Sequence, residues 1–567
     1  MVSHQKQNKR TDIIGLTVAL VIVILMNYVG SFVFSRFDLT TEKRYSLSDA
    51  TKELVSELDD NIYIKIYLEG DLPANFLRLR NSIQETLDEI RAYSNGRLDY
   101  LFINPSESPE KEVRNAIYQE LSDKGIQYSN LRSEDGNIQS EQIIFPGAIF
   151  SYQGKEIPLQ ILKSQLGSSP EVMLNNSIQQ LEYEIASSIK KLVRPKRQKI
   201  AFLEGHGELD DMHLADIAKT LDEFYTVDRA KLGGQLVSLE EYDAVIIAKP
   251  GTIFSEKDKY ILDQFIMNGG KTMWLLDHVL ASMDSLQKSK NGTSTGIPIS
   301  LNLEDMLFRY GCRVNTNLVL DLQSLPIPVV TGYEGNQPKQ ELFAWFYFPL
   351  IMDHPKHPIV NNLDALKTEF VNSIDTVGGK GIKKTILLTS SERSKIAATP
   401  ARISLNMLRY PPDQRQYVKQ HIPIAVLLEG KFQSNYKNRL TEEFTSNSKL
   451  KYKESGVENK MIVVGDGDII KNSINEARGT IKPLGYDIYT QRTYGNKDFI
   501  LNSLNYLLDD SGLIQARSKE FKIRLLNTQK VDAERQKWQL FNTVIPVLLI
   551  ALFGFIQFFI RRRNYTK

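Results

Sequence analysis

Three absences limit the chemistry open to this chain of 567 residues. Its single cysteine, Cys312, allows neither an internal disulfide nor a Cys-x-x-Cys redox pair. No G-x-x-x-x-G-K-[ST] pattern is present, which excludes ATP hydrolysis by a P-loop. The similar residues 269–272 open a strand instead of the helix that a P-loop needs. The formal net charge is only +2, and the basic stretches lack interleaved aromatic residues, so nucleic-acid binding is unsupported.

Two long runs without charged side chains stand near the two ends of the sequence. Ile13 to Phe34 is about 22 residues long and Val544 to Ile560 about 17, lengths that suit helices crossing a bilayer core. The alternatives are a cleaved signal peptide for the first run and a buried core helix for the second. The first run exceeds the usual signal-peptide core and lacks a small-x-small cleavage site, and three arginines end the second. We therefore expect two transmembrane helices.

Basic residues flank both runs on their terminal sides. Lys6, Lys9 and Arg10 precede the first run, and Arg561 to Arg563 follow the second. Short basic segments stay in the cytoplasm. The expected protein therefore crosses a bacterial inner membrane twice, has both termini in the cytoplasm and holds its bulk in the periplasm, with the lipid bilayer as one partner.

About 500 residues lie between the two runs, which is enough for two to four domains. Hydrophobic residues make up 42% of the chain and charged residues 24%, as in folded globular proteins. With one cysteine, such an extracytoplasmic region must gain its stability from packing.

The first part of this region alternates between strand and helix patterns. Expected strands at 62–68 and 98–103 alternate with expected helices at 76–93 and 109–124, and a hairpin at 142–161 turns around Gln153 and Gly154. This order, β-α-β-α-β-β, predicts a thioredoxin-like α/β unit. An amphipathic helix at 176–193 ends it, and Arg194 to Gln198 marks a domain boundary.

The next part has continuous apolar strand patterns separated by helix patterns. Such strands are buried on both faces, so they predict a doubly wound parallel sheet of the flavodoxin or glutamine-amidotransferase type, with helices on both sides. Helices are expected near 212–224, 255–268 and 303–310, the second with Ser255 as its N-cap and Asp258 three residues later. The strand segments lie at 199–203, 226–230, 244–248, 271–276, 318–322, 385–390, 422–429 and 460–465.

Prolines and an aromatic cluster interrupt this pattern between 325 and 358. Six prolines and the aromatic residues 343 and 345–348 indicate an ordered but irregular insertion, which is either a contact surface or a loop that covers the core. A helix at 498–509 and a charged helical stalk follow. The expected organisation is 1–12 cytoplasmic tail, 13–34 transmembrane helix, 35–193 N-terminal α/β domain, 194–512 doubly wound region, 513–542 stalk, 543–560 transmembrane helix and 561–567 cytoplasmic tail.

The strongest candidate site follows the first buried strand of the doubly wound region. Glu204, His206 and Glu208 stand in Glu-Gly-His-Gly-Glu, at the strand end where such sheets place ligands. The three side chains are of types that ligate metal or transfer protons. The competing interpretation is a structural turn with a solvated histidine, and no second His or Cys stands at ligand spacing. The structural turn is therefore the favoured interpretation. The three residues remain candidates for ligand binding, and no metal or cofactor is expected.

Asp277 and His278 follow the strand at 271–276, at the position where a hydrolase or amidotransferase of this fold carries its nucleophile. No Ser or Cys stands there, so no catalytic residue is assigned, although the two side chains remain ligand candidates. Cys312 lacks a strand-to-helix elbow and is expected in the core. The residues Asp466 to Asp468 resemble part of a calcium loop but lack its later ligands, so we expect a turn there.

Several of these stretches resemble one known family. The segment 38–48, DLTTEKRYSLS, is the most specific, and Glu204 to Glu208, Val463 to Asp466 and Gly495 to Phe499 with Asn502 follow in the matching order. Together with the two terminal spans, they make nearly the whole chain similar to the auxiliary protein GldG of the gliding-motility ABC transporter.

This resemblance implies a non-enzymatic, substrate-binding-like subunit that works with a separate cytoplasmic ATPase and a multi-span permease. It also implies a degenerate sheet domain shared with an intraflagellar transport protein, and it supplies no catalytic residues. Two other interpretations follow from the residues: an envelope scaffold that uses the insertion at 325–358, or a periplasmic hydrolase that uses His206 and Asp277. The ligand is unknown.

Overall fold

The computed structural model describes residues 14–26, 46–135, 138–163, 165–193, 198–232, 239–335, 337–352, 355–439, 452–475, 479–509, 511–518 and 528–565. The chain divides into two compact units, Met1–Lys519 and Glu520–Lys567. Both parallel and antiparallel sheets occur in the first unit, which confirms the expected α/β class. Residues 38–45 of the family-like segment 38–48 lie outside the described residues, and so do the boundary residues 194–197.

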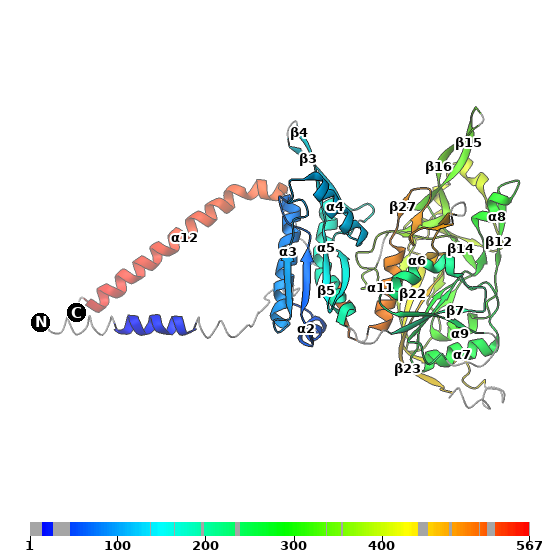
Figure 1. The fold of residues 1–567 in the computed structure, drawn as a ribbon, viewed down its shortest axis with the longest axis horizontal. Coiled ribbons are helices and arrows are strands. Elements are labelled where there is room, and N and C mark those ends of the chain that lie inside the picture. Colours follow the sequence, from blue (N-terminus) through cyan, green and yellow to red (C-terminus); the bar gives the residue numbers. More distant parts are fainter. Residues whose placement is uncertain are drawn as a thin grey trace. The chain divides into compact units, whose positions relative to one another are not determined.

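The N-terminal region is built on a four-stranded sheet with the order β2-β1-β5-β6 (Figure 1). Its strands are β1 (Ile62–Ile66), β2 (Leu98–Phe102), β5 (Gly147–Tyr152) and β6 (Lys155–Gln160). Strands β1 and β2 are parallel, while β5 runs antiparallel to both of its neighbours. The alternation of apolar and polar side chains in IYIKI explains β1, because Ile62, Ile64 and Ile66 are buried and the residues between them are exposed.

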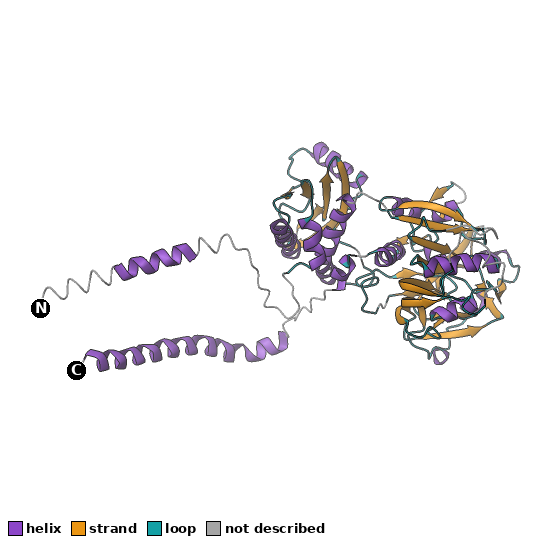
Figure 2. Cartoon of the chain, turned by 90° about the horizontal axis from the view of Figure 1, so that it is seen from below, coloured by secondary structure: helices purple, strands orange, loops and turns teal. Residues whose placement is uncertain are grey.

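Helices cover both faces of this sheet, as Figure 2 shows by colour. Helices α2 (Asp49–Ser56), α3 (Ala74–Tyr93) and α5 (Pro170–Val193) pack into one core with Phe150 of β5. Helix α4 (Lys111–Asp123) packs with Ile149 on the opposite face. The side chain of Ser48 accepts a hydrogen bond from the backbone N–H of Thr51 and caps α2.

One expected strand at 142–152 is two strands in the structure. Strand β4 (Ile138–Ile144) pairs with β3 (Ser129–Asp135) in a separate hairpin, and β5 begins at Gly147 in the main sheet. Pro146 stands between them, and a proline cannot donate the backbone hydrogen bond that a continuous ladder needs. The chain therefore changes sheets at this point.

The central region contains a seven-stranded sheet with the order β19-β22-β23-β10-β9-β7-β8. Five neighbouring strands are parallel, and β22 and β19 add an antiparallel edge. The expected all-parallel sheet is therefore mixed. The strands are β7 (Lys199–Glu204), β8 (Thr226–Lys231), β9 (Ala244–Ala248), β10 (Lys271–Leu275), β19 (Lys383–Thr389), β22 (Pro423–Gln433) and β23 (Ser455–Val464).

Both faces of this sheet are buried under helices. Helices α6 (Asp211–Asp222) and α11 (Asn496–Leu508) pack on the face that carries Ile200 and Phe202. Helices α7 (Glu256–Met267) and α9 (Glu304–Tyr310) pack on the face that carries Ala201 and Leu203. Burial on two faces explains why β9 reads AVIIA, with every side chain buried.

The insertion expected to be irregular is a β-hairpin whose register shifts between Ser324 and Pro326 and between Val330 and Gly332. Strand β15 (Ser324–Glu334) pairs antiparallel with β16 (Gln337–Ile351), and β17 (Leu366–Lys367) extends the sheet beyond β16. Pro326 and Pro328 lie two residues apart on the edge strand β15, so their nitrogens point to the same side, where an open edge needs no donor. The aromatic residues 345–348 are buried in the core beneath the hairpin.

Shorter elements connect these parts. The helical ones are α8 (Met283–Lys288) and short helical turns at Leu405–Arg409, Gln414–Gln416, Asp468–Ile470 and Leu513–Ser518. The small sheets contain β11 (Val279–Leu280), β12 (Thr293–Pro298), β13 (Arg313–Val314), β14 (Asn317–Asp321), β18 (Ile374–Asp375), β20 (Ser394–Ala398), β21 (Ala401–Ser404), β24 (Ile474–Asn475), β25 (Thr480–Ile481), β26 (Tyr486–Asp487) and β27 (Arg492–Thr493).

Two apolar helices lie at the ends of the described chain. Within α12 (Thr528–Tyr565), Ala533–Ile560 is long and apolar enough to cross a membrane, and it includes the predicted run from Val544 to Ile560. Of the predicted run from Ile13 to Phe34, the structure describes the apolar helix Ile14–Met26, which is shorter than a span. Ile13 and residues 27–34 lie outside the described residues. Residues 513–518, expected in the stalk, instead pack against Tyr183 and Ala186 of α5.

Candidate functional site

The candidate residues gather at the carboxyl edge of the parallel strands. His206 follows β7, Lys249 follows β9, Asp277 follows β10, and Asp466 and Asp468 follow β23. Because these strands are parallel neighbours, their carboxyl ends meet at one edge of the sheet. The side chains form two separate polar clusters there, one around His206 and one around Lys249.

His206 is buried between two carboxylates. Its Nδ1 lies 3.3 Å from Oε1 of Glu208, and its Nε2 lies 3.2 Å from Oδ2 of Asp258. The backbone N–H of His206 donates to Oε2 of Glu208 at 2.7 Å. The ring also stacks on Phe254 with a centroid distance of 3.7 Å and an interplanar angle of 11°. The histidine is therefore fixed on every side.

The charge of His206 follows from these contacts. Burial opposes the protonated ring, but the hydrogen bonds with Glu208 and Asp258 outweigh burial and raise the pKa of His206. Both ring nitrogens are occupied, so a metal ion would have to displace one carboxylate. The geometry thus favours a buried ionic turn over a ligating histidine. Glu204, the third predicted residue, points to Arg229 at 3.3 Å and stays largely outside the cluster.

The N-terminal turn of α7 holds Asp258 in place. Ser255 caps the helix, since its hydroxyl accepts from the backbone N–H of Asp258 at 3.2 Å and donates to the Asp258 carboxylate at 2.7 Å. This capping pair is the one that the sequence predicts. The residues that bind His206 thus come from the end of β7 and the start of α7.

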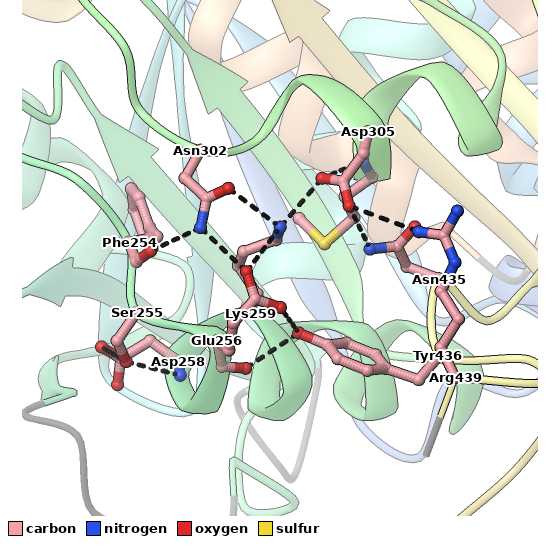
Figure 3. A network of polar contacts seen from close by, with 11 residues as sticks. Phe254, Ser255, Glu256, Asp258, Lys259, Asn302, Asp305, Asn435, Tyr436 and Arg439 are labelled. Carbon is pink, nitrogen blue, oxygen red and sulfur yellow. Dashed lines mark hydrogen bonds and ion pairs between the residues drawn. The ribbon is translucent and has the colours of Figure 1, made fainter. Parts of the chain in front are cut away.

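A second network anchors the same turn from below (Figure 3). Lys259, which is 1% exposed, donates to Asp305 at 2.9 Å, to Glu256 at 3.2 Å and to Asn302 at 3.3 Å. Tyr436 adds a hydrogen bond to Glu256 at 3.1 Å. A buried ammonium with three oxygen partners is well satisfied. The N-terminus of α7 is therefore tied to two separate segments, one at residues 302–305 and one at Tyr436, as Figure 3 shows.

The other cluster is an ion network around Lys249. Its ammonium contacts Asp468 closely and lies 3.1 Å from Oδ2 of Asp277. Oδ1 of Asp277 accepts from the backbone N–H of Gly467 at 2.6 Å. Burial opposes the charged ammonium, yet the two carboxylates raise the pKa of Lys249. Asp277 thus binds internal partners with both of its oxygens.

Asp466 is the most deeply buried acid of this cluster, with 0% exposure. Its oxygens accept from the backbone N–H groups of Asp468 at 2.8 Å and Glu369 at 3.1 Å. Burial, with Asp277 and Asp468 nearby, raises the pKa of Asp466 well above its usual range. Asp466 and Asp468 form the turn predicted for this segment, which continues into the short helix Asp468–Ile470.

His278 is buried beside this cluster with 1% exposure. Among the residues that the structure describes, neither of its ring nitrogens has a hydrogen-bond partner. Burial lowers the pKa of His278, so the ring is neutral. Its position is fixed through the backbone, because its N–H donates to Asn372 at 2.7 Å.

Cys312 is a core residue, as expected. Its side chain is 0% exposed and packs in the apolar cluster under α7 and α9. Burial raises the pKa of the Cys312 thiol to about 12, so the thiolate nucleophile is not formed near neutral pH.

The structure separates the two predicted groups. His206 and Glu208 lie in one cluster with Glu204 beside it, and Asp277 lies in the other with His278 beside it. Sequence reasoning missed Lys249, which is the cation shared by Asp277 and Asp468. The sequence gives little sign of this role, because a single lysine after AVIIA is equally typical of a strand end that faces water.

Together, the sheet and its carboxyl edge define an α/β protein whose strand-end acids and histidine are paired internally. A family model described as an ABC-type uncharacterized transport system matches residues 197–503, which is more than half of the chain. This chain belongs to that family. A domain of unknown function matches residues 41–151, the greater part of the N-terminal region.

One relative spans almost the same length. An uncharacterized protein of Borreliella burgdorferi is 21% identical over 574 residues, covering 98% of this chain and 99% of its own. Among solved structures, the N-terminal domain of mmIFT52 has a TM-score of 0.31 at 13% identity, covering 57% of this chain and 100% of that domain. A ThuA-like protein from Parabacteroides merdae has a TM-score of 0.25 at 11% identity, covering 59% and 94%. These two structural likenesses are too weak to carry an argument.

Proposed function

We propose that this protein is a membrane-anchored auxiliary subunit of an ABC transporter, with its α/β regions outside the cytoplasm. The observation that carries the proposal is the family match across residues 197–503, the central sheet region. Membership of a transport-system family, together with a helix that can cross a membrane, favours a transport-associated role without catalysis of its own.

The terminal segments support the membrane part of the proposal. Ala533–Ile560 is one candidate span, and the apolar helix Ile14–Met26 lies within the first predicted run, 13–34. Basic residues flank both runs on the terminal sides, which favours cytoplasmic termini. In this arrangement residues 35–542 lie outside the inner membrane.

The chemistry of the strand edge supports a non-enzymatic role. Asp277 stands where a hydrolase of a doubly wound fold carries its nucleophile, and Lys249 and Gly467 bind both of its oxygens. His206 is likewise held by two carboxylates. Both groups therefore stabilise the edge, and this argues against the periplasmic hydrolase.

The finer identification rests on the residues that resemble the GldG family. It assigns the protein to a gliding-motility transporter, with a separate cytoplasmic ATPase and a permease as partners. It also assigns a thioredoxin-like fold to 35–193 and a flavodoxin- or amidotransferase-like fold to 194–512. The order β8-β7-β9-β10-β23, which is 2-1-3-4-5 in chain order, supports the second fold.

An envelope scaffold is the second candidate function. The β15–β16 hairpin favours it, because Tyr333 near its turn is 74% exposed and Leu342 is 55% exposed. An exposed aromatic and apolar ribbon is a plausible protein contact. In this case the hairpin would bind an envelope component instead of a permease.

A biotin ligase fused after Lys567 tests the proposal in living cells. We expect biotin on an ABC ATPase, because a cytoplasmic C-terminus would lie next to that subunit. The matched control fuses the same ligase to the second unit alone, Glu520–Lys567, which keeps the anchor and removes the α/β regions. Equal labelling of the ATPase by both fusions, or no labelling, would contradict the proposed partnership.

A further inference from the structure

A cavity of about 590 Å³ lies where the N-terminal region meets the central region within the first unit. Helix α5 and strand β6 line it on the N-terminal side, and the end of α6, the end of α11 and residues 513–514 line it on the other. Its volume is in the range of small-molecule sites, which occur preferentially between domains. None of the predicted strand-edge residues takes part in it.

Hydrogen bonds within the central region, and one between Asn505 and Tyr183 across the junction, hold the walls of this cavity. Tyr225 donates its hydroxyl hydrogen to Asn505 at 2.7 Å, and Asn505 donates to the hydroxyl of Tyr183 at 3.4 Å. The side chain of Gln198 donates to the backbone carbonyl of Leu508 at 3.2 Å. Tyr183 is 5% exposed, and Leu508 is 4% exposed. The cavity is therefore bounded by ordered, packed side chains.

Two of the lysines that line the cavity are already paired. Lys190 donates to Asp509 at 2.7 Å and to Ser511 at 2.6 Å. Lys124 lies 3.3 Å from the carboxylate of Glu156. These pairs neutralise part of the lining and leave those cations with little capacity for a ligand.

Lys191 differs from them. Its ammonium lies over the ring of Phe224, 3.9 Å from the centroid, and no carboxylate in the described part of the chain forms an ion pair with it. Burial lowers the pKa of Lys191, and the more distant Glu184 offsets this only in part. A half-buried cation on an aromatic face gains free energy from an anion in the cavity.

The lining also has an apolar part, beside the side chains of Lys155, Glu156, Glu223 and Asp509. Ile157, Pro158, Leu192, Leu513 and the ring of Phe224 face the same space. A free inorganic anion would contact Lys191 and leave the apolar lining exposed to water. An organic anion would contact both Lys191 and the apolar lining. Burying its apolar body would add roughly 25 cal/mol of binding free energy for each Å² removed from water.

We propose that this cavity binds a small organic anion, with its carboxylate or phosphate on Lys191 and its apolar body against Phe224. The ligand would contact both α5 and the end of α11, so binding would join the N-terminal and central regions. The inference goes beyond the transporter role and does not depend on it, because binding is measured on this chain alone.

The test uses the full-length chain in lipid nanodiscs and ¹⁹F NMR line broadening. The probes are 4-(trifluoromethyl)benzoate and 4-(trifluoromethyl)phenyl phosphate, with the neutral 4-(trifluoromethyl)benzamide as an isostere and inorganic phosphate as a competitor. Empty nanodiscs correct for partition into lipid. The variant Lys191→Met keeps the length of the side chain and removes its charge, and Lys219→Met at an exposed position of α6 is the matched control.

We expect one of the anionic probes to bind, and the preferred one identifies the headgroup. Lys191→Met should weaken it roughly ten- to hundredfold, as for a lost charge-assisted hydrogen bond, while Lys219→Met leaves it unchanged. The neutral amide should bind as weakly to the wild type as the anion does to Lys191→Met. Equal binding of the amide and the anion would overturn the proposal, and so would equal affinity in both lysine variants or no binding to the wild type.

A second variant tests the proposal independently in case Lys191→Met does not fold. Ser187→Phe fills the cavity from α5 and leaves every lysine in place. It should abolish binding of the anionic probe while the far-ultraviolet circular dichroism stays as in the wild type. Retained binding in a folded Ser187→Phe protein would place the probe elsewhere and overturn the assignment.

Discussion

Replacement of His206 by glutamine tests the buried ionic turn after β7. In the wild type, His206 stands between Glu208 and Asp258, whose side chains are only 3% and 5% exposed and whose hydrogen bonds raise its pKa. Glutamine keeps a polar group of similar reach but carries no charge. The variant therefore leaves two buried carboxylates without their cation.

The expected cost follows from the burial of this group. Removing one partner of a buried ion pair costs about 3–5 kcal/mol, because the remaining charge stays desolvated. We expect the low end, about 3 kcal/mol, since Glu208 and Asp258 each keep one other hydrogen bond. At roughly 2 °C per kcal/mol for a large domain, the Tm should fall by about 6 °C.

The pH dependence gives a sharper test than the size of the effect. The pKa of His206 is raised above the unfolded value of about 6.5. Its contribution to stability is therefore complete below about pH 6.5 and is lost as the pH rises through the higher folded pKa. The difference in Tm between wild type and variant should be largest below pH 6.5 and should shrink in alkaline buffer.

The assay is differential scanning fluorimetry of the full-length protein across this pH range. The control is His213→Gln, because His213 is 32% exposed and pairs with the exposed Asp210 at the start of α6. This control should change the Tm by less than about 2 °C, as expected for an exposed pair. A His206→Gln effect that is constant with pH, or that grows as the pH rises, would refute the account of a protonated His206.

Three further predictions test other parts of the structure. Lys249→Met should destabilise the protein by about 3 kcal/mol because it strands buried carboxylates, whereas the exposed Lys231→Met should have little effect in the same Tm measurement. Gly205→Ala should lower the free energy of unfolding, measured with denaturant, by more than about 2 kcal/mol, because φ is +126° and a Cβ would lie 2.1 Å from the carbonyl oxygen of Leu232. Its control, Gly154→Ala, has φ +78° with open space around the Cβ and should lower it by about 1 kcal/mol. Cys312 should resist maleimide at pH 7.5 in the folded chain and react after denaturation, and rapid labelling of folded protein would contradict its burial.

Local patterns in the sequence are sufficient to predict most of the strands and helices. The run AVIIA gives β9 with the predicted bounds, and Ser255 caps α7 with Asp258 at the expected position. Continuous apolar strands between amphipathic helices also predict a sheet covered on two faces. These features depend on neighbours in sequence, so one chain suffices to find them.

Other features depend on contacts that sequence patterns do not carry. Prolines made 325–358 look irregular, but on an edge strand Pro326 and Pro328 disturb no ladder, and the segment forms β15 and β16. The antiparallel direction of β22 is likewise invisible in a buried apolar run. An apolar strand looks the same in either direction.

The candidate site was only partly predictable for the same reason. Its position at the strand ends follows from the fold class, and the residues Glu204, His206 and Asp277 were found there. Their partners come from distant segments. Asp258, which binds His206, lies on α7, 52 residues further along the chain. Asp468, which shares Lys249 with Asp277, lies 219 residues after that lysine. Only the fold shows the internal partners of these side chains, and ligand binding by them stays a prediction.

Affinity purification of the full-length chain from gently solubilised membranes tests the central claim most directly. Mass spectrometry of the eluate should find an ABC permease and an ABC ATPase in amounts comparable to the tagged chain. An equally tagged anchor, Glu520–Lys567, should recover neither. Repeated recovery of the full-length chain with envelope proteins only, or alone, would contradict its assignment as a transporter subunit.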